Sequence, residues 1–181
     1  MIPTFEEVWK YTEQVPGGAY YLGNAKALYK YASECKGTIV EIGVDQGRSA
    51  SILMAVGQVT KVPIYLIDSW ESCLIENLPK VAAKLKDFPL ANVTIIHERS
   101  KDALGAVPGD VHLLHIDGDH YVGIEHDCKL WLPRLISGGV VCFHDYDASF
   151  EAVTRCVNQY CRDAGWEELG NFDSLSVWRK P

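Results

Sequence analysis

The chain has 181 residues, a length that predicts a single domain of ordinary size over 1–181. Apolar residues make up 48% and charged residues 23%, which is typical of a globular domain and excludes a disordered or fibrous chain. Lys and Arg number 17 against 24 for Asp and Glu, so the formal net charge is −7. Nucleic-acid binders usually carry a basic surplus, and we therefore expect no nucleic-acid partner.

The chain contains no apolar run of about 18 residues, so we expect no membrane-spanning helix. Its first residues lack the basic and apolar regions of a signal peptide. The cysteines form no CxxC pair and lie mostly in apolar segments, which predicts free, buried thiols in a cytoplasmic protein. They are Cys35, Cys73, Cys128, Cys142, Cys156 and Cys161.

Strand-like and helix-like segments alternate along the chain. Five near-continuous apolar runs predict strands over 38–44, 62–68, 92–97, 111–117 and 140–144. Because such runs are typical of strands covered on both faces, they favour a parallel sheet between helical layers. Two further strands, over 166–169 and 175–178, have no helix between them and predict a terminal antiparallel hairpin.

The remaining segments have the polar and apolar spacing of helices. They are predicted over 4–14, 24–35, 49–56, 74–86, 101–106, 122–136 and 149–164. We expect Gly57 to close the third of these helices. Pro133 is expected to kink the helix over 122–136 or end it early, and Gly138 and Gly139 to stop it.

In open α/β sheets, ligands bind beyond the carboxyl ends of the strands. The first strand runs into Glu41, Gly43, Gly47 and Ser49, in the pattern E-x-G-x-x-x-G-x-S. The glycines allow a tight turn and close approach to a ligand, and the next helix offers free N–H groups to an anion. Glu41 needs a partner if buried, either a ligand ammonium group or, without a ligand, the backbone or Arg48.

The second strand ends in Asp68, followed by Trp70. An acid at this place is suited to accept both hydroxyls of a ribose, although a helix cap is the alternative. Trp70 either flanks a base or packs in the core. Ser100, after the third strand, is equally suited to contact an adenine or to cap a helix.

The fourth strand ends in Asp117 and His120, and the fifth ends in His144 and Asp145. If these strands are neighbours, the two carboxylates and the imidazole of His144 converge and form a candidate divalent metal site. The alternative is loop acids that cap helices, beside a surface histidine.

The other histidines are interpreted as packing or solvated residues. His112 and His115 lie in the fourth strand, and His126 lies on the polar side of a helix. His115 shares a face with Asp117, which makes it the first candidate for a further role.

Four motifs appear in the same order as in a known family: E-I-G-V-D-Q-G-R-S, the second-strand acid, I-D-G-D-H and G-G-V-V-C-F-H-D-Y. On these motifs the chain, over about 22–178, resembles class I S-adenosylmethionine-dependent methyltransferases. More narrowly it resembles the small metal-dependent O-methyltransferases of the catechol and macrolide-sugar types. The resemblance implies a Rossmann-like, seven-stranded mixed sheet of order 3-2-1-4-5-7-6 with an antiparallel last strand.

Position by position, the resemblance implies a role for each candidate residue. The cofactor-binding residues would be Glu41, Gly43, Gly47, Ser49, Asp68, Trp70, Ser100 and Asp117. The metal ligands would be Asp117, His144 and Asp145, and the catalytic base His120. The family usually has an acid at position 144, and imidazole suits Mn²⁺ or another transition metal better than Mg²⁺. Members of the family often have one residue between this histidine and the next tyrosine, in the pattern D-G-D-H-x-Y. In this chain Tyr121 follows His120 directly.

The expected function is methyl transfer from S-adenosylmethionine to a hydroxyl oxygen of a small molecule, with Mg²⁺ or Mn²⁺. The segment 38–181 would form the cofactor-binding core and 1–37 a helical lid, with Tyr11, Tyr20 and Tyr21 as wall residues. The resemblance also allows a homodimer through the N-terminal helices. The alternatives are a non-catalytic S-adenosylmethionine-binding subunit and a nucleotide-dependent oxidoreductase, against which the missing G-x-G-x-x-G argues.

Overall fold

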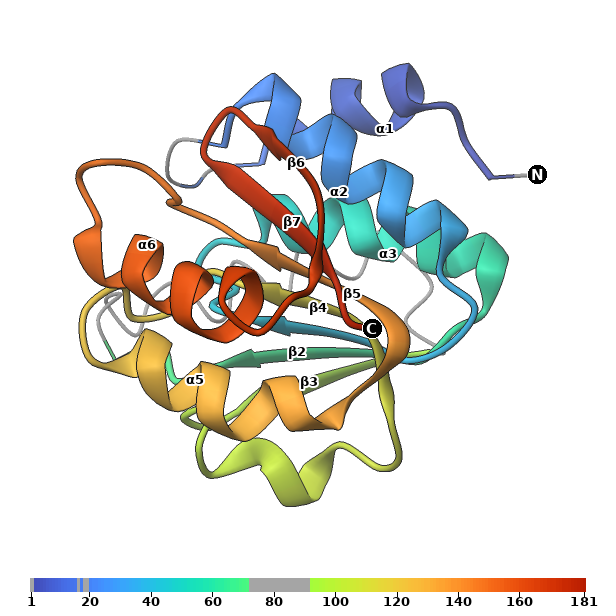
Figure 1. The fold of residues 1–181 in the computed structure, drawn as a ribbon. Coiled ribbons are helices and arrows are strands. Elements are labelled where there is room, and N and C mark those ends of the chain that lie inside the picture. Colours follow the sequence, from blue (N-terminus) through green and yellow to red (C-terminus); the bar gives the residue numbers. More distant parts are fainter. Residues whose placement is uncertain (1, 16, 18–19, 72–91) are drawn as a thin grey trace.

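The computed structural model describes residues 2–15, 17, 20–71 and 92–181. The predicted helix over 74–86 and Cys73 lie outside the described residues. The strands form one sheet of order β3-β2-β1-β4-β5-β7-β6 (Figure 1). The strands are β1 Ile39–Ile42, β2 Ile64–Asp68, β3 Val93–His97, β4 Val111–Ile116, β5 Leu135–Phe143, β6 Glu167–Phe172 and β7 Leu175–Arg179.

The first five strands pair in parallel, whereas β7 runs antiparallel to both of its neighbours, β5 and β6. The predicted order, including the antiparallel last strand, is therefore confirmed. The parallel register also places the ends of β4 and β5 side by side, because Ile116 pairs with Phe143. The residues that follow these two strands must start from neighbouring points at one edge of the sheet.

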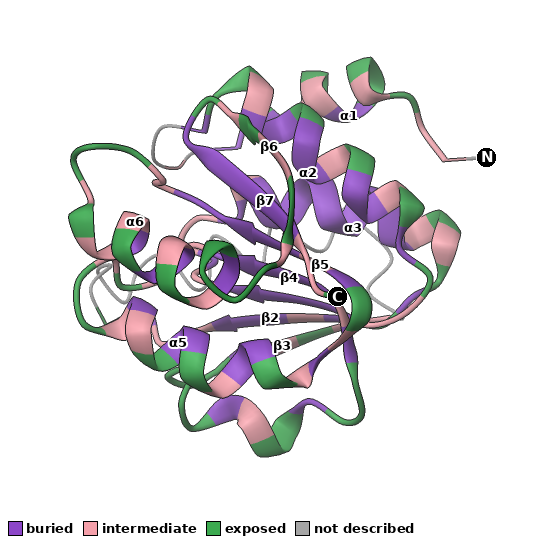
Figure 2. Ribbon diagram, viewed as in Figure 1, coloured by how far each residue is buried: buried purple, intermediate pink, exposed green. Residues whose placement is uncertain are grey.

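Helices cover both faces of the sheet (Figure 1). One face carries α1 Phe5–Thr12, α2 Leu22–Glu34 and α3 Arg48–Thr60, and the other carries α5 Gly123–Trp131 and α6 Glu151–Val157. The strands between the layers are largely buried, and the outer faces of the helices are exposed (Figure 2). Within the described part of the chain, no helix is long and apolar enough to cross a membrane.

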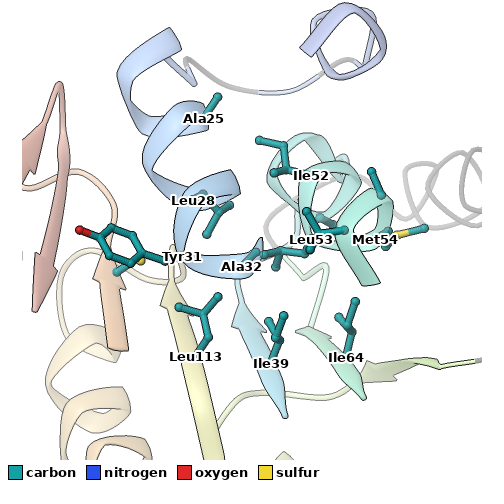
Figure 3. Packing of buried hydrophobic residues seen from close by; sticks show 14 of the residues in the cluster. Ala25, Leu28, Tyr31, Ala32, Ile39, Ile52, Leu53, Met54, Ile64 and Leu113 are labelled. Carbon is teal, nitrogen blue, oxygen red and sulfur yellow. The ribbon is translucent and has the colours of Figure 1, made fainter. Parts of the chain in front are cut away.

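Within the N-terminal segment, which the sequence analysis predicts to form a lid, α2 is part of the hydrophobic core. Its apolar face packs with α3 above β1, β2 and β4, and Leu28 and Ala32 are fully buried there (Figure 3). Tyr20 is buried as well, whereas Tyr21 is exposed. Burial of this face contributes to folding in the same way as the rest of the core.

The structure shows where two of the predicted helices end. The helix α3 runs through Gly57 to Thr60. The helix α5 ends at Trp131, where a short 3₁₀ helix containing Pro133 follows, so the proline rather than the glycine pair ends the helix. The glycines at 138 and 139 lie inside β5, in an irregular stretch where its pairing with β4 shifts register.

The last predicted helix is divided into two parts. The α-helical part, α6, ends at Val157, and a π-helical stretch over Asn158–Arg162 continues it.

Gly43 forms the turn after β1 at a place where no other residue fits. Its φ is +85°, and a Cβ at this position would lie 2.0 Å from the backbone oxygen of Asp117. The chain after β1 therefore approaches the chain after β4 directly, backbone against backbone.

Candidate active site

A cavity of about 730 Å³ opens at the carboxyl ends of β1, β2 and β4 and at the start of α5. This is the edge at which parallel α/β sheets bind ligands. The cavity brings together several residues that the sequence singled out, each from a different loop. They are Gly43, Asp68, Ser100, Asp117 and His120.

Asp68 is held firmly by backbone groups. One carboxylate oxygen accepts hydrogen bonds from the N–H groups of Val44 and Asp45, both at 2.8 Å, and the other accepts one from the N–H of Trp70 at 2.7 Å. An ionised carboxylate has about four acceptor sites and three are used here, so Asp68 can still accept a hydroxyl hydrogen from a ligand in the cavity.

Four of the predicted cofactor-binding residues, among them Glu41, do not line this cavity. Gly47 is the N-cap of α3, with φ +87°, and Ser49 is buried in the first turn of that helix. Trp70 is buried and donates its indole N–H to the backbone oxygen of Asp45 at 2.8 Å. Of the two interpretations of Trp70, the structure shows packing in the core.

Glu41 also lies away from the cavity. It is fully buried in β1, and its Oε1 lies 3.0 Å from Nδ1 of His115, which is fully buried on the adjacent strand β4. His115 is therefore one partner of this carboxylate, whose Oε2 is buried and makes no hydrogen bond with the described residues.

At the ends of β4 and β5, Asp117, His120 and Asp145 form a compact group. Their candidate ligand atoms all lie within 4.8 Å of one another. The Nε2 of His120 lies 2.9 Å from Oδ2 of Asp145 and 3.5 Å from Oδ1 of Asp117. This nitrogen is buried, yet it makes no hydrogen bond of regular geometry with the described residues. Two carboxylates and a nitrogen in this arrangement fit a divalent cation.

The charges in this group act strongly on one another. Burial by itself lowers the pKa of His120, but the close contacts with the carboxylates of Asp117 and Asp145 and their charges outweigh burial and raise it to about 9. For Asp117 and Asp145, burial works in the opposite direction, and contacts with His120 and His144 outweigh it and lower both pKa values. The site therefore stabilises positive charge next to the two carboxylates.

His144 was expected to be the third metal ligand, but it lies behind the carboxylates and does not line the cavity. Its Nδ1 is 3.0 Å from Oδ1 of Asp117 and 3.2 Å from Oδ1 of Asp145. Burial lowers the pKa of His144, and the two carboxylates outweigh that effect and raise it. Its other nitrogen, Nε2, lies 2.9 Å from the amide nitrogen of Asn24 in α2. Asp117 and His120 line the cavity, whereas Asp145 and His144 do not.

Asp127 is a residue of the cavity wall that the sequence analysis missed. It is 2% exposed and accepts a short hydrogen bond from the hydroxyl of Ser100. Its position in α5 carried a signal, because it lies on the same side of the helix as Ile124 and Trp131. A carboxylate on the apolar side of a helix indicates a buried acid with a specific partner.

Burial raises the pKa of Asp127 from 3.8 to about 6, against the opposing hydrogen bond from Ser100. The native state therefore binds this proton more tightly than the unfolded state does. The associated stability is present below about pH 4 and is lost as the pH rises through 6. Relative to Asp127→Asn, we expect the free energy of unfolding of the unmodified protein to fall by about 3 kcal/mol over this range. Urea unfolding of both proteins at several pH values measures the difference; parallel curves would contradict the prediction.

Comparison with known proteins identifies the class to which this fold and site belong. The family model described as "Methyltransferase domain" matches residues 40–146, which is more than half of the chain. The chain therefore belongs to this methyltransferase family, and the resemblance expected from its motifs is confirmed. No curated protein sequence matches the chain.

Solved structures show the same fold at low sequence identity. An SAH-bound methyltransferase from Podospora anserina has a TM-score of 0.74 and 16% identity, covering 98% of this chain and 87% of its own. The O-methyltransferase NovP has a TM-score of 0.74 and 18% identity, covering 97% and 88%. A putative caffeoyl-CoA O-methyltransferase from Staphylococcus aureus has a TM-score of 0.72 and 15% identity, covering 99% and 93%. The fold is that of class I S-adenosylmethionine-dependent methyltransferases.

Proposed function

We propose that this protein transfers a methyl group from S-adenosylmethionine to a hydroxyl oxygen of a small molecule, aided by a divalent cation and a histidine base. One observation carries the proposal: Asp117 belongs both to the wall of the cavity and to the compact group with His120 and Asp145. A cofactor in the cavity and a cation at that group would therefore share one residue. Such proximity is what a reaction between two bound molecules requires.

The cavity fits a nucleoside cofactor. Asp68 offers a fixed carboxylate to ribose hydroxyls, and Ser100 and Asp127 offer polar groups further along the wall. Gly43 and Gly118 line the cavity as well, and the turn at Gly43 brings the chain after β1 against the chain after β4. The structure of an SAH-bound methyltransferase with the same fold supports S-adenosylmethionine as that cofactor. When bound, it would supply the methyl group, activated as a sulfonium.

The group at the ends of β4 and β5 fits Mg²⁺ or Mn²⁺. Asp117 and Asp145 provide carboxylate oxygens, which are the ligands that both ions accept. A bound cation would lower the pKa of an acceptor hydroxyl that it contacts. The group lies beside the exposed side chains of Tyr121 and Val122, which offer an apolar surface to the rest of the acceptor.

His120 is the proposed base. Its Nε2 lies at the cavity beside both carboxylates, where an acceptor hydroxyl would release its proton. With its pKa raised to about 9, the imidazole is protonated at neutral pH and cannot accept a proton. A cation that neutralises Asp117 and Asp145 would remove the cause of that shift. The base and the cation are therefore expected to be required together.

Thermal unfolding tests the cofactor assignment. S-adenosylhomocysteine at 100 times its Kd should stabilise the native state by about 2.7 kcal/mol. For a domain of this size that corresponds to a rise in Tm of roughly 5–10 °C. NAD should leave the Tm unchanged, because the chain lacks the dinucleotide motif. Stabilisation by NAD and not by S-adenosylhomocysteine would contradict the proposal.

Methyl transfer itself is tested with isotopically labelled S-adenosylmethionine and a panel of phenols and glycosides, with Mg²⁺ or Mn²⁺ present. We expect turnover that EDTA abolishes and that added cation restores. Tight S-adenosylhomocysteine binding without turnover on any acceptor would favour a non-catalytic binding subunit.

A further inference from the structure

A buried carboxylate and a serine hydroxyl meet in the wall of the cavity. The hydroxyl of Ser100, in the turn after β3, donates a hydrogen bond to Oδ1 of Asp127 in α5. Both residues line the cavity. The Oδ2 of Asp127 lies beside Gly118, another residue of the wall, where a Cβ would be 3.4 Å from this oxygen. The pair therefore borders any ligand that occupies this part of the cavity.

The same side of α5 also holds the backbone of Ser100. Trp131 lies one helical turn after Asp127, and its indole N–H donates to the backbone oxygen of Ser100 at 3.2 Å. Trp131 is fully buried, so this contact belongs to the core. One helix thus holds both the backbone and the side chain of this cavity residue, which limits the directions that its hydroxyl can take.

The hydrogen of the Ser100 hydroxyl is already used within the protein. A serine hydroxyl has one hydrogen and two lone pairs, and an ionised carboxylate can only accept. The pKa of Asp127 is about 6, so at pH 8 this carboxyl is ionised and takes the hydrogen of Ser100. The lone pairs of the hydroxyl are left for a ligand. Both side chains then present hydrogen-bond acceptors to the cavity.

The strand order places Ser100 and the proposed cation site on opposite sides of Asp68. In the order β3-β2-β1-β4-β5, Ser100 follows β3, Asp68 ends β2 and Asp117 follows β4. A cofactor with its ribose at Asp68 and its reacting methyl group toward Asp117 must extend its base the other way, toward β3. Ser100 and Asp127 then become neighbours of the base.

We propose that Asp127 orients the hydroxyl of Ser100 as a hydrogen-bond acceptor for the exocyclic amine of adenine, so that the protein selects its cofactor by the base. Adenine offers this amine as a donor, whereas hypoxanthine has a carbonyl oxygen in its place. That oxygen would face the lone pairs of Ser100 and the charge of Asp127, acceptor against acceptor. A site built to pair with such a donor rejects the analogue that lacks it. Asp127 is a positioning residue here, and the inference rests on the proposed function for the identity of the cofactor.

Two analogues that differ only in the base test the inference on the unmodified protein. They are S-adenosylhomocysteine and S-inosylhomocysteine, in which hypoxanthine replaces adenine. Calorimetric titration at pH 8 should show about 10- to 100-fold tighter binding of S-adenosylhomocysteine, the usual effect of a hydrogen bond that involves a charged group. Equal affinities, or tighter binding of S-inosylhomocysteine, would overturn the inference.

Two variants of Asp127 separate orientation of the hydroxyl from simple support of the wall. Asp127→Leu removes the acceptor that orients Ser100, so the preference for S-adenosylhomocysteine should fall about 10-fold. Asp127→Asn should keep most of the preference, because its amide oxygen can still accept the hydrogen of Ser100. A side chain that only supports the wall would lower both affinities equally in Asp127→Leu. An unchanged ratio of the two affinities in that variant would therefore overturn the role of Asp127.

Ser100→Ala removes the proposed acceptor itself and should reduce the preference as much as Asp127→Leu does. Combining the two changes should add little, because residues that share one hydrogen bond do not act independently. Glu125→Leu is the matched control, since it removes a carboxylate from the same helix but outside the cavity wall and should leave the ratio unchanged. An unchanged ratio in Ser100→Ala would overturn the inference even if Asp127→Leu fails to fold.

The same titrations distinguish failure of the inference from failure of the proposed function. If both analogues bind with equal affinity, the cofactor assignment stands and base selection by Ser100 and Asp127 falls. If neither analogue binds to the folded protein, S-adenosylmethionine is removed from the proposed function and the inference falls with it.

Discussion

Replacing His120 by alanine is expected to lower methyl transfer by about 10²–10⁴-fold, the usual contribution of a positioned base. The Nε2 of this residue is buried next to Asp117 and Asp145 and reaches the cavity. Without it, the proton of the acceptor hydroxyl has no imidazole to receive it. The measurement is the rate of label transfer from S-adenosylmethionine, at saturating cation, to whichever panel acceptor the unmodified protein uses.

The control for this variant is His112→Ala, which removes a histidine from the opposite end of β4 and should leave the rate unchanged. Calorimetric titration with Mn²⁺ distinguishes the base from a metal ligand. A base assignment predicts that His120→Ala still binds Mn²⁺ through Asp117 and Asp145. Loss of Mn²⁺ binding together with turnover would instead make His120 the third ligand, and unchanged turnover would remove it from the reaction.

Asp68→Asn is expected to weaken binding of S-adenosylhomocysteine by about 10- to 100-fold, as measured by calorimetry. A hydrogen bond to a charged group contributes about 1.5–3 kcal/mol, and the neutral amide cannot replace a carboxylate toward ribose hydroxyls. The amide nitrogen would also face backbone N–H groups, those of Val44 and Asp45 or that of Trp70. The loops that follow β1 and β2 should therefore lose part of their order along with the ligand contact.

Asp110→Asn serves as the matched control, because this carboxylate is exposed at the start of β4 and lies outside the cavity wall. It should leave binding of S-adenosylhomocysteine unchanged. The thermal unfolding of both variants separates a loss of ligand contact from a general loss of structure. Unchanged affinity in Asp68→Asn would mean that this carboxylate does not contact the cofactor.

The fold was predictable because its signals are local. Apolar runs of strand length, with helical periodicity between them, indicate a parallel sheet covered on both faces, and the structure has that sheet. The boundaries were less predictable where two signals compete. At the end of α5, Pro133 ends the helix before the glycine pair can, and Gly138 and Gly139 instead allow an irregular stretch of β5.

The site was predictable in part, for a topological reason. Residues that directly follow parallel strands must meet at one edge of the sheet, so sequence position alone brought Asp117 and Asp145 together and placed Asp68 and Gly43 at the same cavity. Adjacency to a strand end determines where the backbone of a residue lies. It does not say which way a side chain points or which partner it meets.

Those partners were decided only by tertiary structure. His115 meets Glu41 across two strands, Asp127 meets Ser100 across a loop and a helix, and Asn24 meets His144 from 120 residues away. Each is a polar group inside an apolar layer. Burial makes a hydrogen-bonding partner necessary for such a group, but the sequence does not show which residue that partner is. The sequence by itself determined the sheet and the edge where chemistry can occur. Packing of α2 and the terminal hairpin against that edge decided which groups His144 contacts, because a buried donor and its acceptor are paired by three-dimensional contact alone.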